Sequence, residues 1–159
     1  AELNNETLAW VVVERVYDYV DIYNGPEAFA ATLSVLTPGQ RALLAVHWLR
    51  SEVSNGGFSQ FFYNDTAVVC SEAITGLDLL SAPEVAALLR RACQLFPGGV
   101  PPQLRADREA FLDGLPDGKL EAHLDSLNEL FYAELPGLYQ HAAEYIRSHP
   151  SEFAIIGAA

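Results

Sequence analysis

The chain has 159 residues, half of them hydrophobic, and its 21 acidic and 9 basic side chains give a net charge of −12. This length suits one domain with a hydrophobic core, and the composition excludes a disordered chain. The excess of acids disfavours direct binding to DNA or RNA, because that affinity comes largely from Lys and Arg contacts to phosphates.

The acidic charge is concentrated at both ends of the chain. Residues 1–40 and residues 121–159 each carry six acids and one base, whereas residues 81–120 carry five of each. A small domain needs a net charge of only about 2 to 8 in magnitude for solubility. The excess therefore favours a basic partner.

The sequence contains no predicted membrane segment. No apolar run approaches the roughly 20 residues that span a bilayer, and the first residues lack a signal-peptide pattern. We therefore expect a cytoplasmic protein. Cys70 and Cys93 lie on apolar faces and are expected to be buried free thiols, because disulfides are rare in that compartment.

Hydrophobic periodicity predicts helices throughout, with no sustained two-residue alternation. We expect an all-α fold, a single compact domain at 1–159 with about eight or nine helices. The predicted helices cover about residues 5–23, 26–36, 38–54, 66–80, 83–96, 103–112, 118–134 and 136–149, with a further short helix after Gly57. Thr37 and Gln40 have the spacing of a capping box.

The first predicted helix carries acids on its polar side. Glu14, Asp18 and Asp21 stand at i, i+4 and i+7, opposite an apolar face. On the third predicted helix, His47 lies between Val46 and Trp48, as is typical of a core or boundary histidine. No residue at a suitable spacing identifies a catalytic partner for it.

The stretch from Asn55 to Asn64 joins two glycines to a dense set of aromatic and amide side chains. Asn55 and Gly56 are residue types that end helices in the left-handed conformation. One interpretation is a helix corner that organises the core; the other is a small-ligand site. The residues concerned are Asn55, Gly56, Gly57, Phe58, Gln60, Phe62 and Asn64.

An acidic row marks the predicted helix at 118–134. Asp117, Glu121, Asp125 and Glu129 recur every four residues, which spaces them roughly 6 Å apart along a helix. Like charges at this spacing weaken an isolated helix slightly. The row is either a solvated face, with Asp117 as a helix cap, or a negative track spaced somewhat like backbone phosphates.

Four short motifs resemble a bacterial family of small helical domains of unknown function whose characterised member is a DNA-mimic protein. The motifs together cover roughly residues 40–153, with the helices at 5–36 packed on that core. They are Asn55-Gly56-Gly57-Phe58 with Gln60, Phe62 and Asn64; Phe96-Pro97-Gly98-Gly99 with Pro101-Pro102; Leu124-Asp125 with Phe131-Tyr132; and Tyr145-Ile146 with His149-Pro150 and Phe153.

The resemblance implies an all-helical fold and a homodimer, and the family has no agreed catalytic residues to assign here. We expect no cofactor and no metal. It also implies that an acidic surface occupies the DNA-binding face of a helix-turn-helix regulator. From charge, we expect the partner-binding acids to be Glu14, Asp18, Asp21, Asp117, Glu121, Asp125 and Glu129. The alternatives are an interaction module whose charge serves only solubility, and a ligand binder at the Asn55–Asn64 corner.

Overall fold

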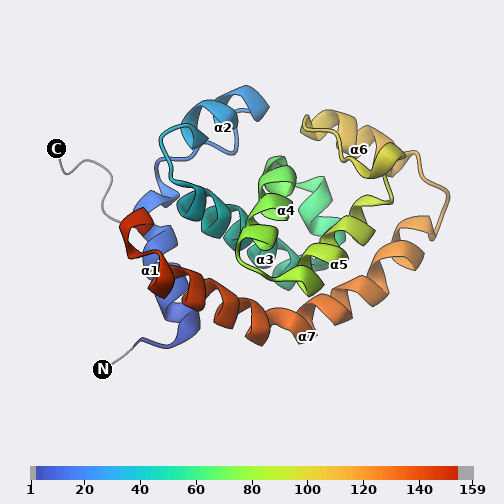
Figure 1. Ribbon diagram of the computed structural model, residues 1–159. Coiled ribbons are helices and arrows are strands. Elements are labelled where there is room, and N and C mark those ends of the chain that lie inside the picture. Colours follow the sequence, from blue (N-terminus) through green and yellow to red (C-terminus); the bar gives the residue numbers. More distant parts are fainter. Residues whose placement is uncertain (1–2, 154–159) are drawn as a thin grey trace.

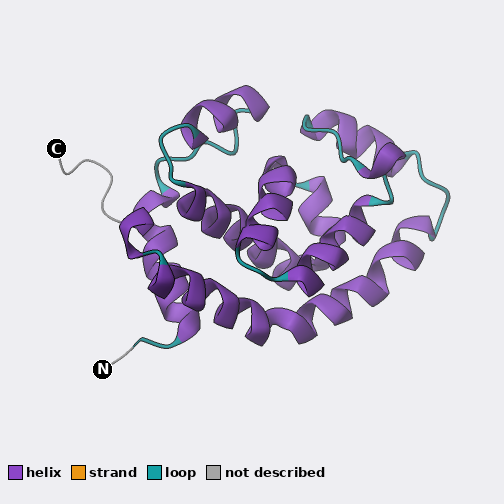
Figure 2. Ribbon diagram, in the orientation of Figure 1, coloured by secondary structure: helices purple, strands orange, loops and turns teal. Residues whose placement is uncertain are grey.

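The computed structural model describes residues 3–153, and within that range it contains helices and no strand (Figures 1 and 2). The all-α prediction is confirmed. The α-helices are α1 (Asn5–Tyr17), α2 (Pro26–Leu33), α3 (Pro38–Tyr63), α4 (Cys70–Leu79), α5 (Pro83–Cys93), α6 (Arg105–Asp113) and α7 (Lys119–Ser148). Three short 3₁₀ helices, η1 (Asp65–Val69), η2 (Pro97–Gly99) and η3 (Pro150–Phe153), lie between or after them.

The described residues form seven α-helices and not the expected eight or nine. The predicted helices at 118–134 and 136–149 are one helix, α7, with Pro136 inside it on the exposed side. The predicted helix at 38–54 likewise continues through Gly56 and Gly57 as α3. A proline or a glycine pair bends a helix without ending it when both halves are held by packing.

Helix α3 forms the centre of the fold and packs against α1, α4, α6 and α7. Its first turn is closed by the predicted capping box: the Thr37 hydroxyl accepts from the Gln40 N–H at 3.2 Å, and Gln40 Oε1 accepts from the Thr37 N–H at 3.0 Å. Leu49 and Phe62 are fully buried on its two halves. The capping box thus fixes where the central helix begins.

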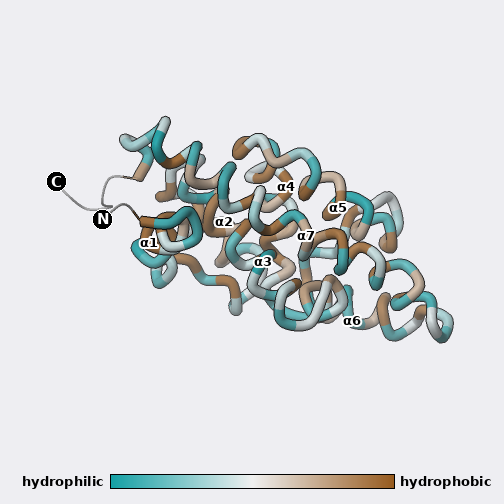
Figure 3. Tube along the Cα trace, turned by 90° about the horizontal axis from the view of Figure 1, so that it is seen from below, coloured by the Kyte–Doolittle hydropathy of each residue, from teal (hydrophilic) through white to brown (hydrophobic). Residues whose placement is uncertain are grey.

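Helix α7 runs along one side of the molecule as a long curved helix, passing α5 and α3 before reaching α1 (Figure 1). Leu124, Leu127 and Phe131 are buried on its inner side. Seen from below, hydrophobic and hydrophilic residues alternate along the helical tubes (Figure 3). This pattern is expected of helices that bury only one face.

Helix α1 ends earlier than predicted, at Tyr17. The Asp21 carboxylate accepts from the backbone N–H groups of Tyr23 and Asn24 at 3.1 Å each, so residues 21–24 form a turn. Aspartate stabilises such turns by bonding the backbone two or three residues ahead. Val13 and Phe29 are buried in the common core, which places α1 and α2 on the rest of the chain.

Both cysteines are buried free thiols, as predicted. Their Sγ atoms lie 3.4 Å apart between α4 and α5. The hydrogen bond with the Cys93 thiol, together with burial, raises the pKa of Cys70 well above its ordinary value. No helix within residues 3–153 is long and apolar enough to span a membrane.

Candidate functional site

The acidic row lies on the exposed face of the first half of α7. Glu121, Asp125 and Glu129 all point to solvent, opposite the buried leucines of the same turns. None of these three carboxylates forms an ion pair or a side-chain hydrogen bond with another residue in the described range. Three uncompensated negative charges therefore follow one helix face at spacings of about 6 Å.

Asp117 does not continue this row. Helix α7 begins at Lys119, and the left-handed Gly118 (φ 73°) stands at its N-cap with no side-chain cap. Asp117 is exposed in the preceding turn. The predicted capping role of Asp117 is wrong, because the glycine occupies the cap position and turns the chain there.

The sequence reasoning missed further acids near the row. Asp113, at the end of α6, accepts a hydrogen bond from the Tyr63 hydroxyl at 2.9 Å. Burial and this hydrogen bond raise the pKa of Tyr63, and the negative charges of Asp113, Glu121 and Glu109 raise it further. The acids of α6 and α7 therefore both raise the pKa of the same tyrosine. Because residues 81–120 carry equal numbers of acids and bases, their net charge did not predict an acidic surface here.

The N-terminal acids lie at the other end of the molecule. Glu14 is exposed on α1 and Asp18 is the residue that caps its end, but Asp21 lies in the following turn. There, the Asn24 side chain and backbone donate to Asp21 and lower its pKa. The predicted helical alignment of Asp21 with Glu14 is therefore wrong, because α1 ends before it.

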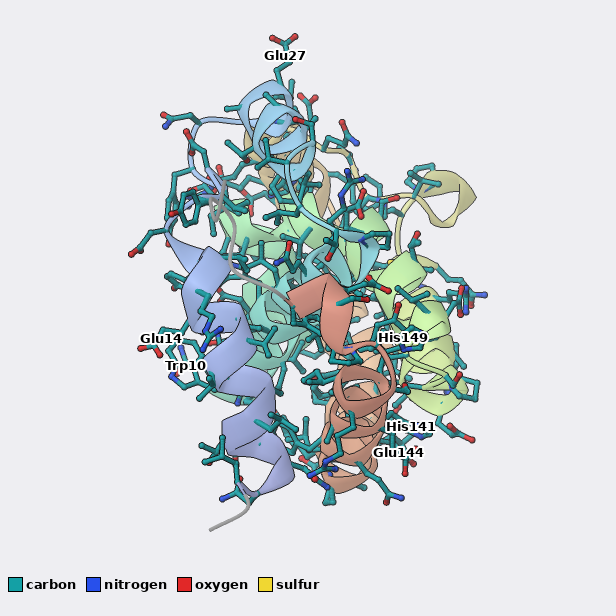
Figure 4. All side chains as sticks on the ribbon, turned by 60° about the vertical axis from the view of Figure 1, so that its left-hand side comes forward. Trp10, Glu14, Glu27, His141, Glu144 and His149 are labelled. Atoms are coloured by element: carbon teal, nitrogen blue, oxygen red, sulfur yellow. The ribbon has the colours of Figure 1, made fainter. Side chains whose placement is uncertain are left out.

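The two predicted groups of acids do not form one surface within a single chain. Helix α1 contacts the second half of α7, where Tyr139 donates to Glu6 at 3.0 Å, whereas the acidic row occupies the first half (Figure 1). In Figure 4, Glu14, Glu27 and Glu144 point away from one another on three different helices. The α6–α7 acids are therefore a separate surface from those on α1.

The acidic row lies beside the kink of α3. Gly57 adopts φ 73° and ψ −178°, a conformation favourable only to glycine. The kink frees the Phe58 N–H, which donates to Asn128 on α7 at 2.9 Å, while Tyr132 donates to the Val53 carbonyl at 3.0 Å. The predicted break is thus a bend held by α7, and Gly57, not Asn55 or Gly56, has the positive φ.

The amide side chains at the corner are occupied within the protein. Glu52, one helix turn before the kink, accepts from Gln60 at 2.7 Å, from Asn64 at 2.9 Å and from Thr66 at 3.0 Å. Asn55 donates in turn to Gln60 at 3.2 Å. Phe58 and Phe62 are fully buried. These contacts favour the structural interpretation of the corner over the ligand site, which stays an untested prediction.

Arg108 is a second residue that the sequence reasoning did not single out. Its side chain is fully buried and donates to four backbone carbonyls, at 2.7–2.9 Å: those of Phe62, Asn64, Pro102 and Gln103. Burial lowers its pKa. An arginine in a mixed-charge helix gives no local sign that it points inward, so only the tertiary structure reveals it.

No group of three or more His, Cys, Asp or Glu side chains that could hold a metal ion occurs in the described range.

No curated protein and no solved structure matches the chain. A family model described as "DMP19-like protein" matches residues 34–149, which is more than half of the sequence. The match runs from the end of α2 to the end of α7 and includes both the kink and the acidic row. The chain therefore belongs to the DMP19-like (DNA-mimic protein 19-like) family.

Proposed function

We propose that this chain is a non-enzymatic DNA mimic that occupies the DNA-binding surface of a basic transcription regulator. The observation that carries the proposal is the uncompensated row of Glu121, Asp125 and Glu129 on α7, in a member of the DNA-mimic protein 19-like family. Asp113, exposed at the end of α6, extends the negative charge beyond α7. A helix-turn-helix regulator is the partner we expect.

The spacing of the row supports this function. Carboxylates four residues apart on a helix are separated by about 6 Å along its axis, and two steps of one DNA strand rise about 6.8 Å. A surface that binds successive phosphates through Lys and Arg can therefore meet successive carboxylates. Association of this kind is fast and weakens as salt rises.

A homodimer is part of this proposal. Two copies would present two acidic rows to a regulator that itself binds DNA as a dimer, as many helix-turn-helix proteins do. Sedimentation equilibrium of the purified chain measures this directly. A monomer at the concentration where the regulator is captured would remove the dimer from the proposal and leave the single row.

Reversal of the row tests the function. The variant Glu121→Lys/Asp125→Lys/Glu129→Lys is compared with Glu27→Lys/Glu84→Lys/Glu144→Lys, which makes the same change of net charge at scattered exposed sites. Each protein is used to capture regulators from a low-salt lysate, which are eluted with rising salt or with competing DNA. We expect the row variant to lose a DNA-competed regulator and the scattered variant to retain it.

Two results would contradict the proposal. Equal loss in both variants would indicate that the total charge acts without a specific surface. Capture that neither salt nor DNA affects would favour an interaction module whose charge serves only solubility. A further variant, Glu14→Lys/Asp18→Lys, separates any contribution of the acids on α1.

A further inference from the structure

A cavity of about 310 Å³ lies between α1, α3 and the second half of α7, away from the acidic row. Its apolar wall includes Val13, Leu43 and Leu138, and Trp10 of α1 and Tyr139 of α7 add aromatic rings. This volume is at the lower end of the range of about 300–1,000 Å³ found for small-molecule sites. The cavity thus has the size and the apolar lining of a site for a small ligand.

Two polar side chains of α3 line this cavity: one contacts aromatic rings, and the other contacts the side chain of Tyr139. His47 and Arg50 are three residues apart on α3, so they share one face of that helix. Within the described range neither ring nitrogen of His47 makes a hydrogen bond; its contacts are with the rings of Trp10, Tyr17 and Trp48. Burial, together with the positive charge of Arg50, lowers the pKa of His47 to about 4.

Arg50 is half-buried and forms no ion pair with a described carboxylate. Its guanidinium lies over the ring of Tyr139, 5.8 Å from the centroid. Glu6 lies at the same rim, but it is exposed and accepts from the Tyr139 hydroxyl. A half-buried guanidinium has five donors arranged to bind a planar carboxylate.

We propose that this cavity binds a small planar aromatic carboxylate, whose carboxylate accepts from Arg50 and His47 and whose ring contacts Trp10 and the apolar wall. Charge complementarity selects the anion, because the guanidinium of Arg50 lines the cavity and forms no ion pair with a described carboxylate. Ring stacking and burial of apolar surface select a flat hydrocarbon body. The α1 wall of the cavity, including Trp10, lies outside the residues that match the family model, whereas the α3 and α7 walls lie within them.

The test uses 2-naphthoate as the probe and the full chain labelled with ¹⁵N. The two tryptophans give two indole N–H resonances, assigned with Trp48→Phe. Trp10 lines the cavity, whereas Trp48 stacks on Tyr17 with centroids 5.0 Å apart. We expect a saturable shift of the Trp10 resonance, a smaller effect on Trp48, and binding of uncharged 2-naphthamide that is at least about tenfold weaker.

Two substitutions at the rim are expected to have opposite effects, and a third, away from the cavity, is the charge-matched control. Arg50→Gln should weaken 2-naphthoate binding at least about tenfold, because a charged hydrogen bond is lost. Glu6→Gln keeps an acceptor for Tyr139 and removes a negative charge, so it should strengthen binding by about twofold to fivefold. Arg15→Gln, on an exposed part of α1, makes the same charge change as Arg50→Gln and should leave affinity within about twofold.

Several outcomes would overturn this site. The first is equal affinity for 2-naphthoate and 2-naphthamide, and the second is equal loss in Arg50→Gln and Arg15→Gln. A third is the absence of any saturable Trp10 shift at millimolar probe. A fourth is a dimer that Trp10→Ala converts to monomer while 2-naphthoate has no effect, because the cavity would then be covered by a second copy. Circular dichroism confirms that each variant is folded.

Discussion

The carboxylates of α3 and α7 differ in exposure and in hydrogen bonding. Glu52, beside the kink, is half-buried and accepts from three side chains, whereas Glu129 on α7 is exposed and accepts from none in the described range. The first carboxylate is held by neutral hydrogen-bond donors of the protein and links residues on both sides of the kink. The second remains available to a partner. The role of an acid here is decided by its surroundings and not by its charge.

The largest expected effect on stability is that of replacing the buried Arg108. Arg108→Met removes four hydrogen bonds and leaves four carbonyls to find other donors, so we expect it to lower the free energy of unfolding by about 3–5 kcal/mol. Urea denaturation measures the loss. Arg105→Gln, which breaks two exposed ion pairs to Asp65 and Glu109, should cost at most about 1 kcal/mol. Similar losses in the two variants would show that burial does not distinguish these arginines.

Glycine substitutions test whether the fold needs the kink of α3, beside which Glu52 lies. At Gly57, an added Cβ would meet Asn128 Nδ2 at 2.7 Å in a backbone conformation that only glycine tolerates. Gly57→Ala should therefore cost about 2–3 kcal/mol. At Gly137, within α7, an added Cβ meets nothing within 4 Å, so Gly137→Ala should stabilise by up to about 1 kcal/mol. Thermal unfolding of both variants checks the signs; a stable Gly57→Ala protein would mean that the kink is not required.

Matched amide substitutions compare the two carboxylates directly. Glu52→Gln replaces one of the two accepting oxygens by an NH₂ group and removes the negative charge that Gln60, Asn64 and Thr66 bond to, so we expect it to lower stability by about 2 kcal/mol. Glu129→Gln removes repulsion along the row and should change stability by no more than about 0.5 kcal/mol, in the stabilising direction. Guanidinium denaturation of the pair provides the measurement. If both variants lost the same stability, the proposed difference between the hydrogen-bonded Glu52 and the free Glu129 would be wrong.

The smallest expected effect concerns pH. The folded pKa of His47, about 4, lies below the ordinary value of 6.5, so the unfolded chain takes up the proton first. Stability from this residue is therefore present above pH 6.5 and is lost as the pH falls from 6.5 towards 4. Because the side chain is only half-buried, we expect a loss of about 1–2 kcal/mol.

The measurement is the stability of wild type minus that of His47→Gln at several pH values between 4 and 7. The difference should shrink as the pH falls, while substitution of exposed His149 leaves the profile unchanged. A pH-independent difference would show that burial does not lower the pKa of His47, and it would contradict the placing of this side chain in a largely apolar cavity.

Local sequence signals predicted much of the fold because local interactions produce it. The Thr37–Gln40 capping box and a helix starting at residue 26 were predicted from the sequence, and both are present. Boundaries were less reliable where a single residue can act in two ways. Pro136 can begin a helix or lie within one, and packing along α7 decided between these.

The candidate surface was predicted only in part. Periodicity alone placed Glu121, Asp125 and Glu129 on one face, but Asp117 and Asp21 left their rows because turns begin there. Asp113 and Arg108 come from the same short helix, yet one points to solvent near the row and the other is fully buried. Neighbours in space, which a linear pattern does not contain, determine that difference.

By itself, the sequence determined the helical class, the helix starts with local caps, the excess of negative charge and the spacing of the acids on α7. These properties depend on residues within a few positions of one another. The tertiary structure alone decided which carboxylates are hydrogen-bonded within the protein, that Glu52 links residues on both sides of the kink, and that Arg108 bonds the end of α3. It also decided that His47 and Arg50 share a cavity with α1 and α7. Those properties depend on contacts between distant segments, because burial and hydrogen bonding are set by whatever the folded chain brings alongside.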